Sequence, residues 1–393
     1  MTTRNTPHYD VIIAGARCAG AATALLLARQ GARVLVLDKS RYGTDTLSTH
    51  ALMRGAVVQL HRWGLLPAVA GAGTPPVRST TFHLADAVTT ILVKPKHGVE
   101  ALYAPRRRVL DAILADAARS AGADVRFGTS LTGLRRDRAG RVTGITGRAG
   151  GTHLEASADL VVGADGRRST VARWVGAEAA HVAPASSVLI YRYVLHDATD
   201  GFHWYFRDGA AAGVIPTNDG QACVFAATSA ERLQGEPDRG ADTAWRRILD
   251  RAAPALAERL DQRGPAGPPR VFPGLTGYLR DAAGPGWALV GDAGYFKDPI
   301  SAHGITDALR DAEILACAVV SGGPDAARRY QAERDELSLR LFRVTARIAS
   351  FAWTADEIGN HLLELGNAMT EETAAMTAGD QGDPGRRLEL RSA

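Results

Sequence analysis

Cysteine and lysine are scarce in this chain of 393 residues. The three cysteines, Cys18, Cys223 and Cys317, lie far apart, so they form neither a disulfide framework nor a metal-binding spacing. This usage is typical of a reducing compartment, and we expect a cytoplasmic protein. Because lysine is rare, nearly all of the positive charge is arginine. The net charge of +4 is small, and the one dense basic run is residues 106–108, which argues against nucleic-acid binding.

The chain also lacks a long uninterrupted apolar run. The first ten residues contain no apolar core of the kind found in signal peptides. The most apolar stretch, residues 11–28, is interrupted by Arg17 and by small residues, so we expect no membrane span. The length allows two or three domains with a sizeable core, and no internal repeat is visible.

Residues 9–40 have the order strand, glycine turn, helix, strand. Residues 11–13 form a β-branched run suited to a buried parallel strand, and Gly15 and Gly20 follow it. Asp38 comes after the second strand, at the spacing expected of a carboxylate that binds a ribose hydroxyl. A helix N-terminus after a tight turn is suited to a pyrophosphate. We therefore predict a dinucleotide site here, the alternative being a plain βαβ unit with two glycines.

Arg17 stands where the usual G-x-G-x-x-G pattern has its second glycine. An arginine restricts the approach of the backbone to a ligand, but its guanidinium is electrostatically favourable beside a pyrophosphate. We expect it to contact the cofactor.

The remaining periodicity predicts both helices and antiparallel strands. We predict strands within 76–99 and 131–158, a separate core strand at 160–162, antiparallel strands over 186–228 with turns at 208–209 and 219–220, helices near 51–63, 103–122 and 243–260, a linker at 264–269, and helices over the last 70 or so residues. The polar tail after about Gly379 is expected to be disordered.

Two further motifs follow predicted strands. Asp165 and Gly166 lie just beyond one of them, and this pair by itself is also a common plain turn. Asp292 follows another strand, before residues 301–304, which open a helix from about Ile305. An aspartate there can accept from a ribityl hydroxyl, and the helix N-terminus can stabilise an anion. The alternative for Asp292 is a turn or N-cap aspartate.

GARCAG with Asp38, GADGRRS, and GDAGYFKDPISAHG occur in the order and spacing of FAD-dependent monooxygenases of the para-hydroxybenzoate hydroxylase type, which the chain resembles over residues 9–320. The resemblance implies an α/β fold with a Rossmann-like FAD-binding domain, an antiparallel β-sheet substrate domain and C-terminal helices. We predict the FAD-binding domain at 8–75, 100–180 and 276–325, the substrate domain at 76–99 and 181–275, and the helical region at 326–393.

The resemblance also assigns cofactor-binding residues. These are Gly15 and Gly20 at the pyrophosphate, Asp38 at the adenosine ribose, Arg107 at the phosphates, Asp165 near FAD and the docking nicotinamide, Asp292 at the ribityl chain, Pro299 beside the isoalloxazine, and Gly304 with Ile305 at its N1 edge. Arg17, which departs from the family pattern, and Lys39 are also candidate cofactor-binding residues. His303 is a departure, because the family usually has glycine-rich sequence there. No metal site is expected.

The sequence shows only one dinucleotide-binding unit, which FAD would occupy. NAD(P)H would therefore have to dock transiently. As the resemblance implies, hydride would reduce FAD, O2 would add at C4a, and the hydroperoxide would hydroxylate or epoxidise an aromatic or polyketide-like molecule. The antiparallel layer would cover the substrate cavity, with Tyr191, Tyr193, Trp204, Phe206 and Ile215 as candidate wall residues. Each has plain core packing as its alternative.

His50 and His303 are the acid/base candidates, because each lies in a loop predicted to face the flavin. The alternative for each is a hydrogen-bonded structural histidine. Pro299 joins the catalytic candidates through its expected place beside the isoalloxazine.

Three rival functions remain open. A flavin-dependent halogenase shares the fold, but the chain lacks its W-x-W-x-I-P element, having Trp204-Tyr205-Phe206 and a separate Ile215-Pro216. A flavin-dependent reductase of unsaturated bonds, similar to geranylgeranyl reductases, is the second. A non-enzymatic flavoprotein is the third. The expected partners are a small molecule and O2, and the expected assembly is a monomer or homodimer.

Overall fold

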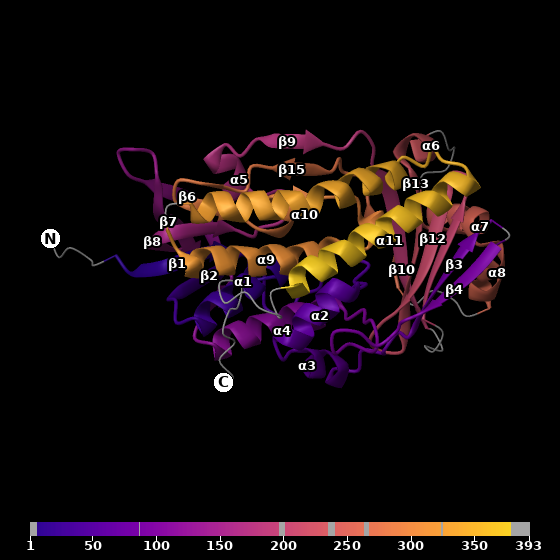
Figure 1. Cartoon of the computed structure of the whole chain (residues 1–393), viewed down its shortest axis with the longest axis horizontal. Coiled ribbons are helices and arrows are strands. Elements are labelled where there is room, and N and C mark those ends of the chain that lie inside the picture. Colours follow the sequence, from indigo (N-terminus) through magenta and orange to yellow (C-terminus); the bar gives the residue numbers. More distant parts are fainter. Residues whose placement is uncertain are drawn as a thin grey trace.

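The computed structural model describes residues 6–85, 87–195, 201–234, 240–262, 267–323 and 325–378. The tail predicted after Gly379 lies outside these residues, as does the first part of the predicted linker, residues 264–266. Figure 1 shows two sheets at opposite ends of an elongated molecule. The long helices α9 (Gly304–Ser321), α10 (Ala326–Ala349) and α11 (Ala355–Ala378) lie across it.

The first sheet has a parallel centre. Its strand order is β16-β17-β8-β1-β2-β5, and β7 joins β6 to β8. The strands are β1 (His8–Ala14), β2 (Val34–Asp38), β5 (Asp124–Phe127), β6 (Thr129–Arg136), β7 (Val142–Ala149), β8 (Thr152–Gly163), β16 (Ala283–Gly284) and β17 (Trp287–Leu289). Because β1, β8 and β17 are parallel neighbours, their carboxyl ends meet at one edge. The three sequence motifs follow these three strands, so the structure brings them together as predicted.

The predicted division between small strands at 131–158 and a core strand at 160–162 is wrong. A single strand, β8, covers both. Its first half pairs antiparallel with β7, and its second half pairs parallel with β1 and β17. The first half of β8 therefore continues directly into the second half, whose last three residues, 161–163, are buried.

Helices cover both faces of this sheet. α1 (Cys18–Arg29), α4 (Arg107–Ser120) and α9 pack together on one face, and α5 (Thr170–Val175) contacts β8 and β17. The predicted helices at 51–63 and 103–122 start too early, because α2 (Arg54–Arg62) and α4 begin several residues later. Leu52 and Tyr103 pair in an antiparallel bridge, which holds both segments extended just before their helices.

The second sheet is the predicted antiparallel layer. Its order is β14-β10-β13-β12-β11-β3-β4, with one parallel pair, β11 with β3. The strands are β3 (Ser79–Leu84), β4 (Ala87–Leu92), β10 (Ser187–Leu195), β11 (Phe202–Arg207), β12 (Ala210–Pro216), β13 (Gln221–Ser229) and β14 (Arg270–Phe272). The predicted turns are confirmed: Gly209 (φ +71°) joins β11 to β12, and Asp219 (φ +64°) lies between β12 and β13.

The helix predicted at 243–260 is two helices, α7 (Ala241–Ala252) and α8 (Pro254–Asp261). Pro254 lacks the N–H that a continuous helix would need and starts the second helix instead. The remaining elements are α3 (Leu66–Gly71), α6 (Ala230–Gln234), the 3-10 turns η1 (Gly291–Ala293) and η2 (Pro299–Ser301), and a small sheet of β9 (Ala179–Val182), β15 (Tyr278–Arg280) and β18 (Tyr295–Phe296).

The two faces of the second sheet bury different clusters. One face packs against α7 and α8. The other contributes Tyr191, Trp204 and Ile215 to the main core, which also contains α1, α4 and α9. The space between the two sheets is therefore one continuous core, in which a site could be enclosed. The α/β fold class is confirmed, while the proposed domain boundaries remain a prediction. Within the described residues, no helix combines the length and apolar character needed to cross a bilayer.

Candidate functional site

The glycine turn after β1 is tightly closed. Gly15 has φ +106° and donates its N–H to the Leu37 carbonyl at 2.8 Å. A Cβ on Gly20 would lie 1.8 Å from the Gly15 carbonyl oxygen, so only glycine fits there. Ala16 N–H donates to Asp38 Oδ2 at 2.8 Å. This contact ties the start of α1 to the end of β2, as a dinucleotide-binding turn requires.

Asp38 is almost fully buried at the end of β2. Its second carboxylate oxygen accepts from the backbone N–H and the hydroxyl of Ser40, at 2.7 and 2.6 Å. The predicted ribose ligand is therefore also the group that holds the turn and the following loop in place. Lys39, its predicted companion, is exposed to solvent beside it.

Arg17 and Arg107 meet on one carboxylate. Arg17 Nη1 lies 3.2 Å from Asp111 Oδ2, and the Arg107 guanidinium donates to both oxygens of Asp111. Burial would lower the pKa of Arg107, but the charge of Asp111 beside it outweighs this and holds the pKa above its ordinary value. Two guanidiniums against one carboxylate leave a net positive charge at the N-terminus of α1, which suits a pyrophosphate.

Cys18, at the first position of α1, is part of the same group, because its thiol donates to Asp111 at 3.1 Å. Burial raises the pKa of this thiol. Cys18 is therefore a neutral structural donor rather than a nucleophile.

Asp165 has a structural role in the turn before α5. The sequence analysis gave such a plain turn as the alternative to cofactor binding. Its carboxylate accepts from the Thr170 backbone N–H at 2.6 Å and from the Ser169 hydroxyl, at the start of α5. The neighbouring Ala164 N–H donates to the Ala14 carbonyl, which places the motif directly beside the glycine turn. A role for Asp165 toward FAD or nicotinamide remains a prediction.

Asp292 lies at the end of the third strand, within η1, and is half-buried. Burial raises the pKa of its carboxyl group to about 6. Among the described residues, none donates a hydrogen bond to this carboxylate, although the Asp292 carbonyl accepts from Tyr278 at 2.6 Å. A polar group that is partly withdrawn from water without a donor is costly, unless a ligand supplies the hydroxyl.

The first turn of α9 is the other open feature. Gly304 is exposed, and a Cβ added to it would meet nothing within 4 Å. His303, the N-cap residue, makes no side-chain cap hydrogen bond, so the N–H groups of this turn are available to a ligand. Pro299 is half-buried at the start of η2, whereas Ile305 is buried.

These residues fit FAD at four independent points. Gly15 and Gly20 permit close backbone approach, and Arg17 with Arg107 gives positive charge at the N-terminus of α1. Within the part of the chain that the structure describes, the carboxylate of Asp292 has no hydrogen-bond donor. The start of α9 offers free N–H groups. Bound there, FAD would supply hydride acceptance and reaction with oxygen, and the protein would supply orientation and charge.

His50 is buried and has φ +54°, a conformation that is uncommon for residues other than glycine. Its Nε2 lies 3.1 Å from the Tyr193 hydroxyl, and the two rings are stacked at 5.6 Å. No described residue hydrogen-bonds its Nδ1. Burial, together with repulsion from Arg106, lowers the pKa of His50 to about 3, so the ring is neutral.

Tyr191 adjoins this pair. Its hydroxyl accepts from the Ser48 backbone N–H at 3.2 Å, and its ring lies 5.7 Å from that of Tyr193. Two of the five predicted wall residues therefore form a polar group with His50. The other three are packed in the core: Trp204 lies against Phe225, Phe206 lies against Trp353, and Ile215 is fully buried. For these three, the geometry favours the core alternative.

Sequence reasoning missed the charges around Tyr193. The guanidinium of Arg106 lies 3.7 Å from the centre of the Tyr193 ring, and that of Arg270 lies 5.4 Å from it. Asp45 pairs with Arg106 at 2.6 Å and with Arg270 at 3.5 Å. The arginine run at 106–108 was the one available signal, but nothing in the sequence connected it to Asp45 or Arg270.

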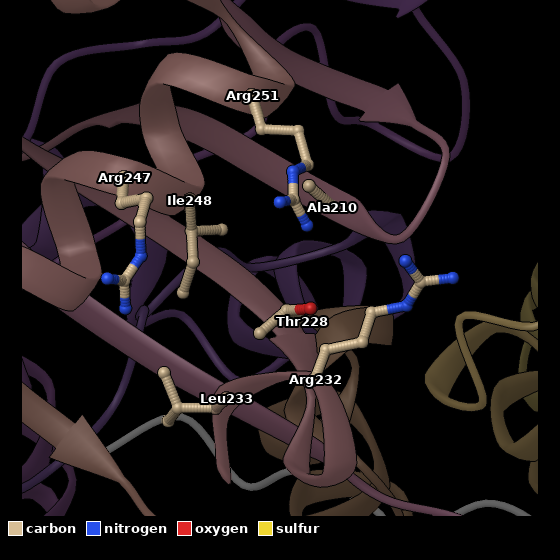
Figure 2. A pocket seen from close by; sticks show the side chains of 7 residues that line it. All are labelled: Ala210, Thr228, Arg232, Leu233, Arg247, Ile248 and Arg251. Carbon is tan, nitrogen blue, oxygen red and sulfur yellow. The ribbon is translucent and has the colours of Figure 1, made fainter. Parts of the chain in front are cut away.

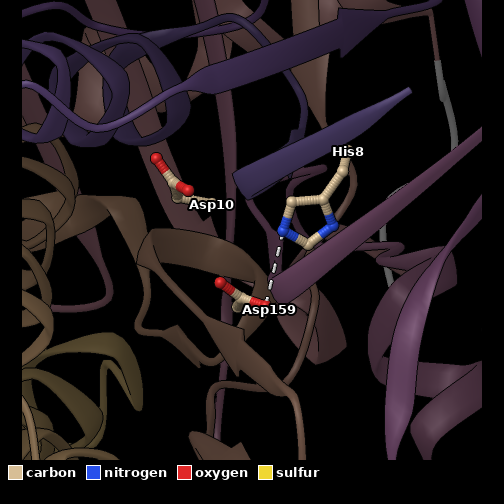
Figure 3. A group of neighbouring side chains, drawn as sticks. All are labelled: His8, Asp10 and Asp159. Atoms are coloured by element: carbon tan, nitrogen blue, oxygen red, sulfur yellow. Dashed lines mark ion pairs between the residues drawn. The ribbon is translucent and has the colours of Figure 1, made fainter.

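Two other groupings lie away from these residues. Figure 2 shows a pocket between the second sheet, α6 and α7, where the guanidiniums of Arg232 and Arg247 lie on opposite sides of Thr228. Figure 3 shows His8 and Asp159, which pair at 3.6 Å, with Asp10 nearby. Asp10 already pairs with Arg33, and this second group is exposed to solvent. We therefore assign no binding site to either grouping.

Comparison with known proteins agrees with this geometry. The family described as "FAD binding domain" matches residues 8–345. A digeranylgeranylglycerophospholipid reductase of Methanothrix thermoacetophila is 27% identical over 330 residues, which are 80% of this chain and 79% of the relative.

Two solved structures share the fold. The flavin-dependent brominase Bmp2 has TM-score 0.77 and 20% identity, covering 93% of this chain and 94% of that one. pqsL of Pseudomonas aeruginosa, a probable FAD-dependent monooxygenase, has TM-score 0.73 and 21% identity, covering 92% and 100%. Since the family match extends over most of the chain, this protein belongs to the FAD binding domain family and is an FAD-dependent oxidoreductase.

Proposed function

We propose that this chain is an FAD-dependent monooxygenase that hydroxylates or epoxidises a small aromatic or polyketide-like molecule, with NAD(P)H as the transient reductant. The single observation that supports this most is the buried His50–Tyr193 hydrogen bond beside Tyr191. This pair would serve as a proton path, enclosed in the core between the two sheets. Hydroxylation of an electron-rich ring benefits from removal of a proton from the substrate, and such a path would accept it.

His50 would act as a relay rather than as a resting base. With a pKa of about 3 it holds a proton only briefly, but a neutral imidazole has one N–H and one acceptor nitrogen. As the Tyr193 hydroxyl proton arrives at Nε2, the proton on Nδ1 would pass to a water or a substrate group bound beside it, because Nδ1 is buried and no described residue hydrogen-bonds it. Tyr193 would take the substrate proton, and the same exchange would restore its hydroxyl.

Arg106 and Arg270 would favour the deprotonated form of the substrate. Both guanidiniums face the Tyr193 ring, and the single carboxylate of Asp45 leaves them with a net positive charge. A phenolate or enolate near them would be stabilised, and negative charge on the ring makes it more reactive toward oxygen transfer. These polar groups suit a compact, ionisable substrate better than a long isoprenoid chain.

A reductase of unsaturated bonds is the second candidate, and a specific observation favours it: the Methanothrix relative, at 27% identity over four-fifths of this chain, is named a reductase. Such a reaction would use the same FAD and the same hydride donor, but would add hydrogen to the substrate instead of oxygen. Whether the product gains oxygen or hydrogen therefore distinguishes the two proposals.

Halogenation is less well supported. The chain has four lysines; Lys39, Lys94 and Lys96 are exposed, and Lys297 is buried in an ion pair with Asp307. None of them is a free amine beside the Tyr193 group, and the W-x-W-x-I-P element is absent. A product whose mass depended on chloride or bromide would overturn this view.

The deciding experiment is a panel of aromatic and polyketide-like compounds, scored for substrate-stimulated NAD(P)H oxidation. Under ¹⁸O₂, a monooxygenase incorporates one labelled oxygen atom per NAD(P)H consumed. If turnover continues without oxygen and the product gains two hydrogens, the reductase proposal replaces the first.

We further propose that this reaction takes place in the cytoplasm. Within the described residues, none of Cys18, Cys223 and Cys317 forms a disulfide, which agrees with a reducing compartment. The expected assembly is a monomer or a homodimer.

A further inference from the structure

Strand β4 forms an open edge of the second sheet. It is the last strand in the order of that sheet, and among the described residues only those of β3 pair with it. All six of its residues are exposed, among them Val88 at 62%, Ile91 at 55% and Leu92 at 70%. Figure 1 shows β3 and β4 at the end of the molecule opposite the N-terminus. An open edge of this kind can pair with a strand of another chain.

Alternate residues of β4 direct their backbone groups away from β3. Just beyond the end of the strand, the Val93 N–H donates to the Arg78 carbonyl at 2.8 Å, so the odd-numbered residues face β3. In an antiparallel pair, every second residue directs its N–H and its carbonyl to the other side. The backbone groups of Val88, Thr90 and Leu92 therefore point to the open edge.

The other edges of the two large sheets have features that discourage pairing, and β4 has none of them. β14 and β16 are only three and two residues long, and β5 has the charged side chains of Asp124 and Arg126. β6 ends in two arginines and pairs with β7 in an irregular register. In contrast, β4 contains no charged residue, no proline and no shift of register, and residues 88–91 are all β-branched. This edge is therefore the one suited to accept another strand.

We propose that β4 pairs with β4 of a second copy of this chain, antiparallel, about a two-fold axis through Thr90. A two-fold interface requires a surface that is complementary to itself. Val88 and Leu92 lie at equal distances on either side of Thr90, so this register gives every outward N–H of the strand an acceptor. Thr90 would bond to the partner's Thr90, and Val88 would bond to the partner's Leu92. A shifted two-fold register would leave the outward groups of Val88 or Leu92 without a partner in the strand.

The same register matches the exposed side chains. On one face of the sheet, Val88 would lie opposite the partner's Leu92, and on the other face Ile91 would lie opposite the partner's Thr89. Pairs of apolar and β-branched side chains across neighbouring strands stabilise a sheet. The pairing would therefore cover all three apolar side chains that β4 exposes most.

The distribution of charge favours a second copy over other partners. Residues 87–93 contain no charge. The nearest lysine, Lys94, is four positions from the axis, so the two copies of it would lie about 27 Å apart at about 3.4 Å per residue. This is well beyond the Debye length of about 8 Å, so they would not repel each other. An anionic membrane would attract Lys94 and Lys96, but lipid tails offer no hydrogen bonds to the open edge.

The pairing surface is small, which determines how tight the dimer is. β4 contributes six residues per copy, whereas a stable interface has roughly 20–30 residues a side. We therefore expect a reversible dimer with a dissociation constant on the order of 10 μM. The inference requires neither bound FAD nor turnover, so it and the proposed function can fail separately.

The first test is sedimentation velocity of the full chain from about 1 to about 200 μM, where mass action should convert monomer to dimer. Leu92→Lys should weaken the dimer at least about tenfold, because it places a charge on the paired edge. Leu363→Lys is the matched control, since Leu363 is 68% exposed but lies in α11. Its dimer should equal that of the wild type. A wild type that stays monomeric, or a dimer that Leu92→Lys leaves unchanged, would overturn the proposal.

A second test determines the register by oxidative cross-linking. Thr90→Cys should form a disulfide between copies, because the axis places the two Cα atoms about 5.5 Å apart. Thr89→Cys should not, since its two Cα atoms would be about 8 Å apart, beyond the reach of a disulfide. The wild type shows the background from its own cysteines. Cross-linking of Thr89→Cys in place of Thr90→Cys would exclude the proposed axis. A monomer that instead co-sediments with phosphatidylglycerol vesicles, and loses this binding in Leu92→Lys, would assign the strand to a membrane surface and refute the dimer.

Discussion

Tyr193 and His50 are 143 residues apart in the chain, yet the Tyr193 hydroxyl lies 3.1 Å from His50 Nε2. One residue belongs to a strand of the second sheet and the other to a loop that leaves the first. The hydrogen bond therefore joins the two layers where the core between them contains polar groups. Their stacked rings and the guanidinium of Arg106 make this the most specific polar arrangement on that face of the sheet.

Replacement of Tyr193 by phenylalanine tests the relay. The change removes the hydroxyl but keeps the ring under Arg106, so FAD content should stay at the wild-type level. We expect kcat to fall by about 10²-fold, which is the usual size of a lost proton-transfer step. Steady-state kinetics measure it, with Tyr205→Phe, on the opposite face of β11 from Trp204, as the control. Unchanged kcat in Tyr193→Phe would exclude the relay.

His50 should also make stability depend on pH. Its pKa is about 3 in the folded chain and 6.5 when exposed, so the unfolded state binds more protons between these values. The free energy of unfolding therefore decreases as the pH falls from about 6.5 toward 3, by up to about 1.4 kcal/mol per pH unit. His50→Asn, which tolerates the positive φ, should show a shallower decline. Urea unfolding at pH 7, 6 and 5 measures both proteins, and parallel curves would contradict the prediction.

Asp292→Asn should separate cofactor binding from folding. No protein hydrogen bond to this carboxylate is lost among the described residues, and a partly buried charge is removed. The apoprotein should therefore keep or slightly raise its melting temperature, while its Kd for FAD rises about tenfold because a charged hydrogen bond is lost. Asp165→Asn is the contrasting variant: it weakens the carboxylate that accepts from Thr170 and should lower the melting temperature. Flavin fluorescence titration and thermal unfolding give the two readouts.

Gly20→Ala should abolish FAD binding. The new Cβ would lie 1.8 Å from the Gly15 carbonyl, so the backbone of the turn must move. We expect a loss of more than about 3 kcal/mol in the free energy of unfolding, beyond the usual range for overpacking. Gly71→Ala, at the end of α3 with nothing within 4 Å, is the control and should be near neutral. A Gly20→Ala protein that purifies with bound FAD would refute this view of the turn.

The sequence by itself determined the α/β class, the cofactor and the edge of the sheet at which the three motifs meet. Its information is local: a β-branched run, two glycines and Asp38 within one βαβ unit specify that unit almost completely. Asp165 and Asp292 could be placed in the same way, because each directly follows a strand, and the ends of neighbouring parallel strands meet at one edge. Most errors concerned element boundaries, as at Leu52 and Tyr103, whose pairing no local pattern shows.

Only the tertiary structure decided which polar side chains act together. His50 was a plausible loop histidine, but its partner Tyr193 and the charges of Arg106 and Arg270 come from distant parts of the chain. Glu372 carried no signal at all within a helical stretch, yet its carboxylate lies 2.5 Å from His303 Nε2. The physical reason is that periodicity reports which face of an element is buried, whereas hydrogen bonds and ion pairs depend on which faces meet. That choice is made by the packing of the whole chain.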